Sequence, residues 1–271
     1  MSCSGKWAGS SVKNMFTYID THTHLYLEQF DKDRESVVAK AVNAGVEYML
    51  LPNVDEETIQ PMMELCAAFP VNCKPMMAMH PTSVKEDFEE VLARIKPWFE
   101  KEKMHAVGET GIDLYWDKTF FTQQVQAFKT QIEWALEYDL PVVIHSRNSV
   151  QEIMEVLDGY RGKGLKGVMH CFPGNVEQAH WFTEFGFMLG IGGVVTYKKS
   201  MMAMVVEEVE AEYLILETDA PYLPPVPHRG KRNESSYIPI IAQKVAELKS
   251  TDVETIARVT TENAKKLFQL S

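Results

Sequence analysis

Short apolar runs alternate with longer amphipathic stretches along nearly the whole chain. We expect the apolar runs to form strands at 16–24, 46–52, 74–81, 104–110, 140–145, 165–171, 186–193 and 212–220. The stretches between them have apolar positions three and four apart, as in helices that bury one face; they lie at 33–44, 55–69, 86–102, 119–138, 149–158, 175–185 and 200–208. Two further helices are expected at 236–248 and 252–268. The pattern is one of repeated strand-then-helix units.

Eight such units predict an α/β fold, a TIM-like (β/α)8 barrel formed as a single domain. The strands are mostly apolar, as is typical of parallel strands buried on both faces, and 271 residues suit a barrel of about 250. An open doubly wound sheet is the alternative, but no G-x-G-x-x-G follows the first strand, which disfavours its dinucleotide-binding form. We assign residues 15–271 to the barrel and expect residues 1–14 to be a loose N-terminal extension.

The charge balance narrows the range of partners. Lys and Arg total 27 against 38 Asp and Glu, so the net charge is −11. Such a chain has no general attraction for nucleic acid or anionic membranes, although it is compatible with a local basic groove or a phosphate-binding metal site. No apolar run reaches the about 20 residues of a membrane span, no signal peptide is recognisable, and the cysteines are too scattered for a disulfide framework. We expect a cytoplasmic protein with no membrane association and no obligate protein partner.

Ionisable residues stand where most of the predicted strands end, which in such a barrel is the face that holds the functional site. Only the second and seventh strands lack one; the others end in His22 and His24, His80, Glu109, His145, His170, and Glu217 with Asp219. Asp20, His22 and His24 follow one another at intervals of two residues, so an extended strand would turn all three side chains to one face. A single histidine of this kind is more often a hydrogen-bonded structural residue, but so many together predict a metal site.

The number of potential ligands favours two ions over one. His22, His24, Glu109, His145, His170 and Asp219 make six, whereas one catalytic ion with an open position needs three or four. Six ligands suit two divalent ions that share a bridging carboxylate, at a separation of about 3.5–4 Å. Such a pair clamps an in-line displacement at phosphorus or activates water against a carbonyl group.

Five motifs in order give the chain a resemblance to the TatD family of metal-dependent deoxyribonucleases, over roughly Tyr18 to Phe268. They are DTHTHL at 20–25, VGETGID at 107–113, PVVIHSR at 141–147, GVMHCFPG at 167–174 and LETDAPYLPPVPHRGKRNE at 216–234. The resemblance implies that His22, His24 and Asp219 bind one ion, that His145 and His170 bind a second, and that Glu109 bridges them. Thr110 departs from the branched apolar residue that is commoner in the family, and MAMHP replaces a glycine-rich version before His80.

The mechanism that we expect is hydrolysis by a water whose pKa the ions lower. Glu109 and Asp219 are the catalytic candidates: Asp219 would orient the water and accept its proton, although a metal-bound carboxylate is a weak base. His80 and Arg147 are candidates to hold phosphate oxygens. Glu217 and Asp20 are candidates to orient a histidine ligand, with a salt bridge or a helix cap as the alternative.

The expected substrate is the end of a single nucleic acid strand, because the chain has no extended basic face for a duplex. This favours a 3′–5′ exonuclease on single-stranded DNA, with RNA as a further substrate. The one basic cluster, PHRGKR at 227–232, places His228 and Arg229 as further substrate contacts, and Tyr115 and Trp116 are candidates to stack on a base. The histidine ligands suit Zn or Mn, whereas the family activity is usually described with Mg.

Two other functions fit part of this pattern. Amidohydrolases and phosphotriesterases share the fold and most of the histidines, and would act on a small amide, ester, lactone or phosphoester. Many of them bridge their metals with a modified lysine at the end of the fourth strand, where this chain has Glu109. A metal-binding scaffold without activity is disfavoured, because it would not need a complete ligand set.

Overall fold

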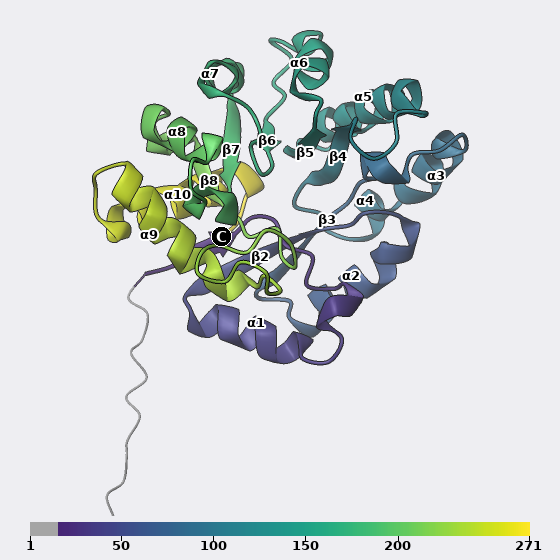
Figure 1. The fold of residues 1–271 in the computed structure, drawn as a ribbon. Coiled ribbons are helices and arrows are strands. Elements are labelled where there is room, and N and C mark those ends of the chain that lie inside the picture. Colours follow the sequence, from purple (N-terminus) through teal and green to yellow (C-terminus); the bar gives the residue numbers. More distant parts are fainter. Residues whose placement is uncertain (1–15) are drawn as a thin grey trace, which may run out of the picture.

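The computed structural model describes residues 16–271 (Figure 1). The proposed N-terminal extension, residues 1–14, lies outside the described residues. The strands are β1 (Tyr18–Asp20), β2 (Val46–Pro52), β3 (Cys73–Met76), β4 (Val107–Asp113), β5 (Val142–Arg147), β6 (Gly167–Met169), β7 (Phe187–Ile191) and β8 (Leu214–Leu216). The helices are α1 (Arg34–Asn43), α2 (Glu56–Ala68), α3 (Phe88–Ile95), α4 (Trp98–Lys101), α5 (Phe121–Glu137), α6 (Val150–Asp158), α7 (Val176–Phe185), α8 (Met201–Glu208), α9 (Ile238–Leu248) and α10 (Val253–Phe268).

The strands form a closed parallel barrel with the helices outside it (Figure 1). Regular pairing runs in two parts, β1-β2-β3 and β4-β5-β6-β7-β8. Backbone hydrogen bonds close both gaps: Gly108 N–H donates to Met77 O at 3.2 Å between β3 and β4, and Thr21 N–H donates to Leu216 O at 3.0 Å between β8 and β1. The predicted (β/α)8 barrel is therefore confirmed.

Local sequence explains where several helices begin and end. The Asp55 carboxylate accepts the Thr58 N–H at 3.0 Å and caps α2, as its position before the helix predicts. Gly186 ends α7 in a left-handed conformation with φ 99°, which glycine adopts without strain. The prediction of a single helix at 86–102 is wrong, because α3 and α4 are separate helices. Pro97 stands between them and has no N–H to continue the first helix.

The barrel strands stop in different places from those the apolar runs indicated. β1 ends at Asp20, so His22 and His24 do not lie on a strand, and the expected alternation of three side chains along it is wrong. The N–H of His24 instead donates to Ala220 O at 2.7 Å, on the segment that follows β8. Glu109 lies inside β4 rather than at its end, because β4 continues to Asp113.

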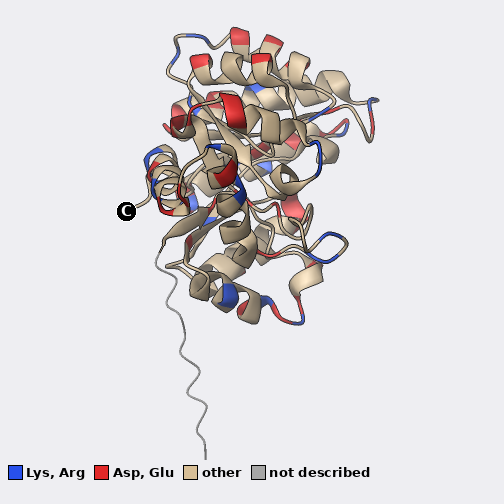
Figure 2. Cartoon of the chain, turned by 60° about the vertical axis from the view of Figure 1, so that its left-hand side comes forward, with Lys and Arg blue, Asp and Glu red and all other residues tan. Residues whose placement is uncertain are grey.

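Acidic and basic residues are interspersed along the ribbon in the view of Figure 2, which shows no continuous basic face. None of the helices between residues 16 and 271 combines the length and the apolar character that crossing a membrane requires. Cys66, Cys73 and Cys171 are free thiols.

Candidate metal centre

A cavity of about 600 Å³ opens at the carboxyl ends of the strands, and the predicted site residues gather in it. His22 is completely buried, and the other five predicted ligands line the cavity: His24, Glu109, His145, His170 and Asp219. The predicted phosphate contacts His80 and Arg147 line it as well. Residues on or just after β1, β3, β4, β5, β6 and β8 thus meet in one place, as strand ends do in a barrel.

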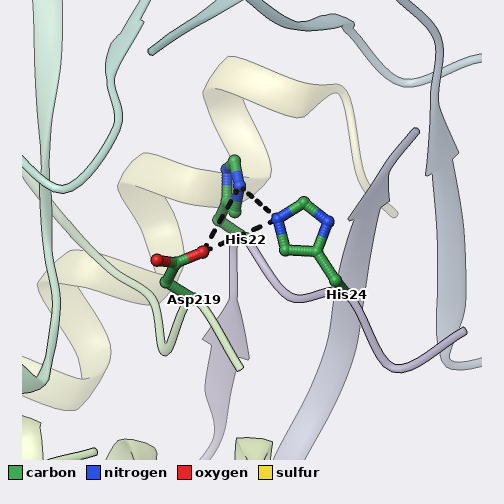
Figure 3. Close-up of side chains that lie close together, drawn as sticks. All are labelled: His22, His24 and Asp219. Atoms are coloured by element: carbon green, nitrogen blue, oxygen red, sulfur yellow. Dashed lines mark hydrogen bonds and ion pairs between the residues drawn. The ribbon is translucent and has the colours of Figure 1, made fainter. Parts of the chain in front are cut away.

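His22, His24 and Asp219 form one side of the centre (Figure 3). The two histidine Nε2 atoms are 3.2 Å apart. Asp219 Oδ1 lies 3.6 Å from His24 Nε2 and 4.0 Å from His22 Nε2. The Asp219 N–H donates to His22 O at 2.9 Å, so the segments after β1 and β8 hold these side chains together through their backbones.

Glu109 occupies the middle of the centre. Its Oε2 lies 3.1 Å from His22 Nε2, and its Oε1 lies 2.9 Å from His145 Nδ1. His80 Nε2 is 3.5 Å and His170 Nε2 is 3.8 Å from the same Oε1. One carboxylate therefore faces histidines on both sides, as a residue that bridges two cations would.

The ligand atoms fall into three groups, and within each group they lie within 4.8 Å of one another. The groups are His22 with His24 and Asp219, His22 with Glu109 and His170, and His80 with Glu109 and His145. In this arrangement His170 lies with His22 and His145 lies with His80, each beside Glu109, whereas the sequence interpretation paired His145 with His170.

Tyr26 determines which nitrogen of His24 is free. The Tyr26 hydroxyl donates its proton to Pro52 O and lies 2.9 Å from His24 Nδ1. Burial raises the pKa of Tyr26 well above its usual value, so the hydroxyl keeps this proton. Since the proton is used on Pro52, the oxygen can only accept from His24, and Nδ1 must carry a hydrogen. The lone pair of His24 is then on Nε2, which faces Asp219 and His22.

Two carboxylates lie against the outer nitrogens of two other histidines. Asp113 Oδ2 lies 2.9 Å from His145 Nε2, which leaves Nδ1 turned to Glu109. Glu217 Oε1 lies 3.0 Å from His170 Nδ1, an ion-pair contact without the geometry of a linear hydrogen bond. Such outer partners orient histidine ligands in metal sites.

Sequence reasoning missed Tyr26 and Asp113. Asp113 is four residues beyond Glu109 in one extended strand, so alternation along β4 places both side chains on the same face. That signal was present in the VGETGID motif. Tyr26 lies beyond the end of β1, so no strand or helix periodicity in the sequence indicates its role.

Asp20 has a different role from Glu217. Its carboxylate accepts the Thr218 N–H at 2.9 Å and the Thr218 hydroxyl at 2.6 Å, and it lies on no imidazole nitrogen. Burial raises its pKa to about 7 in spite of these bonds. Asp20 therefore joins β1 to the segment after β8. His22 Nδ1 has no hydrogen-bond partner within residues 16–271.

The electrostatics of the centre suit a cation. Burial by itself would raise the pKa of Glu109, but His22, His80 and His170 hold it well below its usual value. Burial would likewise lower the pKa of His170, but Glu217 and Glu109 raise it to about 10. Glu109 is thus ionised in a buried place, and the carboxylates around His170 draw positive charge onto that imidazole. Divalent ions with nitrogen and oxygen ligands fit this donor set.

The family model for TatD related DNase matches residues 19–269. The chain belongs to the TatD family. It is 39% identical over 253 residues to the metal-dependent hydrolase YabD of Bacillus subtilis, an alignment that covers 93% of this chain and 99% of that protein. This TatD-family chain is accordingly a metal-dependent hydrolase, as its motifs predicted.

Two further matches cover a similar share of the chain. The chain is 34% identical over 257 residues to the 3′-5′ ssDNA/RNA exonuclease TatD of Pantoea ananatis, which covers 93% of this chain and 99% of that protein. The crystal structure of YJJV, a TatD homolog from Escherichia coli K12, matches with a TM-score of 0.88 at 28% identity, over 94% of this chain and 98% of that one.

Thr110, next to Glu109 on β4, makes a buried hydrogen bond. Its hydroxyl accepts from Gln131 Nε2 at 2.6 Å, and Gln131 Oε1 accepts the Met79 N–H at 2.6 Å. Gln131 on α5 thereby joins β4, next to Glu109, to the segment that carries His80.

The predicted contacts on the PHRGKR segment lie against aromatic rings of the protein itself. His228 stacks on Tyr237 with ring centroids 4.1 Å apart, and the Arg229 guanidinium lies 4.4 Å from the Tyr197 ring centroid. Neither His228 nor Arg229 is among the residues that line the cavity. Their contact with substrate stays a prediction.

Proposed function

We propose that this TatD-family hydrolase is a 3′–5′ exonuclease that removes nucleotides from the ends of single-stranded DNA or RNA, with two divalent ions at its centre. The main support is the convergence of imidazole nitrogens and ionised carboxylates at the floor of the 600 Å³ cavity. A cavity of this volume accepts a nucleotide-sized ligand. The likeness to the 3′-5′ ssDNA/RNA exonuclease of Pantoea ananatis supports the same substrate class.

The residues present suffice to hold two ions. His22, His24 and Asp219 would hold one ion, and Glu109 lies between this group and His145. The resemblance assigns His145 and His170 to the other ion, while in the structure His170 lies with His22 and His145 lies with His80. Nitrogen-rich ligands suit Zn or Mn better than Mg, which prefers oxygen. When bound, the ions lower the pKa of a water and neutralise charge that develops on the phosphate.

Asp219 is suited to orient the attacking water. Burial would raise its pKa, but its contacts with His24, His170 and His22 outweigh burial and keep the pKa below its usual value. Asp219 therefore stays a carboxylate at neutral pH and offers lone pairs to a water in the cavity. The low pKa makes it a weak base, so orientation is the larger part of its contribution.

His80 is suited to donate to a phosphate oxygen. Its Nδ1 accepts the Thr82 N–H at 3.2 Å, so the hydrogen of the neutral ring is on Nε2. Burial lowers the pKa of His80, which keeps the ring neutral. Arg147 also lines the cavity, and its planar fork matches two phosphate oxygens. His228 and Arg229 would contact nucleotides further from the scissile bond.

Degradation of linear and circular single-stranded DNA tests this proposal. Chelator-stripped protein is re-supplied separately with Zn, Mn and Mg and given a 5′-labelled oligomer or the same oligomer ligated into a circle. We expect a ladder of shortened products from the linear oligomer, and none from the circle or with Glu109→Gln protein. Cleavage of the circle would contradict an exonuclease. No cleavage by protein that binds two ions would direct the search to small phosphoesters, amides and lactones.

A further inference from the structure

Trp116 stands exposed at the rim of the same cavity. Its side chain is 69% exposed although it lines the cavity with Glu109 and His145. Tyr115 beside it is 53% exposed, and the two rings meet edge to face with centroids 5.0 Å apart. Both residues belong to the loop between β4 and α5. A large aromatic surface is thus left uncovered next to the metal centre.

The loop that carries these rings is tied to the floor of the cavity. The N–H groups of Tyr115 and Trp116 donate to Asp113 Oδ1 at 2.9 Å and 3.1 Å, while Asp113 Oδ2 holds His145. The backbone that carries the aromatic rings is therefore held beside the metal centre before any ligand arrives.

Arg147 adds an unneutralised cation to the same rim. Its guanidinium carbon is 3.8 Å from the Tyr115 ring centroid and 5.2 Å from that of Trp116. Arg147 forms no ion pair with any residue from 16 to 271. Arg229 likewise has no ion pair with any of these residues, but it does not line the cavity. The remaining arginines have a carboxylate partner: Arg34, Arg94, Arg161, Arg232 and Arg258. In a chain of net charge −11, a guanidinium without a carboxylate is available to an anion.

An aromatic face beside a free guanidinium matches the chemistry of a nucleotide, which has a flat base and a phosphate. We propose that Trp116 and Arg147 form a nucleotide subsite, in which a base near the scissile bond stacks on the indole and the adjoining phosphate binds the guanidinium. The proposal rests on the nucleic acid substrate proposed above. Stacking is tolerant of sequence because every base has a π face, so the subsite would recognise single strands without selecting a base.

Kinetics on natural and abasic oligomers test the subsite. The abasic oligomer carries tetrahydrofuran residues in place of its last three nucleosides, so it has the phosphates without the bases. We expect wild-type protein to show a KM at least about 5-fold lower for the natural oligomer. With Trp116→Ala this difference should disappear, with little change in kcat or in the KM for the abasic oligomer. Trp116→Phe should retain most of it.

Tyr213→Ala provides the matched control, because Tyr213 is an exposed aromatic residue outside the cavity lining. A Trp116→Ala protein whose KM rises equally for both oligomers, or a wild type that treats them alike, would overturn the subsite. Binding of both oligomers to metal-free protein by fluorescence anisotropy separates this failure from that of the proposed reaction. A Trp116-dependent preference for the natural oligomer, without cleavage, would keep the subsite and reject the exonuclease.

Discussion

The floor and the rim of the cavity are built in opposite ways. At the floor, Glu109 and His22 are almost completely buried and each faces several charged or polar neighbours. At the rim, Trp116 and Arg147 are exposed, and the Arg147 guanidinium lies beside the rings of Tyr115 and Trp116. The floor is therefore organised to hold a cation, whichever substrate binds. The rim is organised for a ligand that arrives from solvent.

The largest effect is expected from Glu109→Gln at the floor. The change removes the central negative charge between histidines on both sides, so the loss of activity should exceed the about 100-fold that follows loss of an outer partner. Rates of oligomer degradation measure it, and near-ultraviolet circular dichroism checks that the fold is retained. Retention of more than a tenth of the activity would show that the centre does not depend on a bridging carboxylate.

Tyr26→Phe should have the next largest effect. Removal of the hydroxyl leaves His24 free to place its hydrogen on Nε2, the nitrogen that faces Asp219. We expect metal affinity to fall by about 10- to 100-fold, measured by isothermal titration of the metal-free protein. Tyr48→Phe is the control, since its hydroxyl bonds to Ser271 O, outside the cavity. Equal affinity in wild type and Tyr26→Phe would refute the tautomer argument.

At the rim, Arg147→Ala should act on binding rather than on the metal centre. Loss of a hydrogen bond to a charged group costs about 1.5 kcal/mol, which is about a tenfold increase in the KM for an oligomer. Metal affinity should not change. Arg161→Ala is the matched control, because Arg161 also lies on an aromatic ring, 4.7 Å from the Trp181 centroid, but outside the cavity lining. Arg229→Ala should affect only longer oligomers, and less strongly.

The smallest effect is expected at the ion pair between Asp33 and Arg232, which ties the PHRGKR segment to the start of α1 at 2.7 Å. Asp33→Asn should lower the free energy of unfolding by at most about 1 kcal/mol, because both side chains are partly exposed. The bond to Arg232 lowers the pKa of Asp33, so the stabilisation is present above the unfolded pKa. It is lost as pH falls through the lower folded value.

Unfolding of wild type and Asp33→Asn at pH 7 and pH 3 measures this difference. The two proteins should differ more at pH 7 than at pH 3, and the KM of the variant should equal that of wild type. A raised KM would instead indicate that this segment contacts the substrate.

Much of the site was predictable because barrel topology brings strand ends together. The sequence positions of His145 and His170 were enough to indicate that they face the same cavity, although 25 residues separate them. The position of Glu109 was predictable as well, since an ionised residue in an apolar strand needs a compensating charge. The prediction of local geometry failed, because β1 ends before His22. His22 and His24 do lie together, but alternation along a strand is not the reason.

The amino-acid sequence by itself determined the strand-and-helix order, the closed barrel and the residues that meet at its mouth. These follow from periodic burial and from short motifs, both of which are local properties of the chain. Only the tertiary structure decided that His170 lies beside His22, that Tyr26 directs the lone pair of His24, and that Arg147 reaches the rim without a carboxylate partner. Such facts depend on where the backbone leaves each strand and on contacts between distant segments, and no local pattern records them.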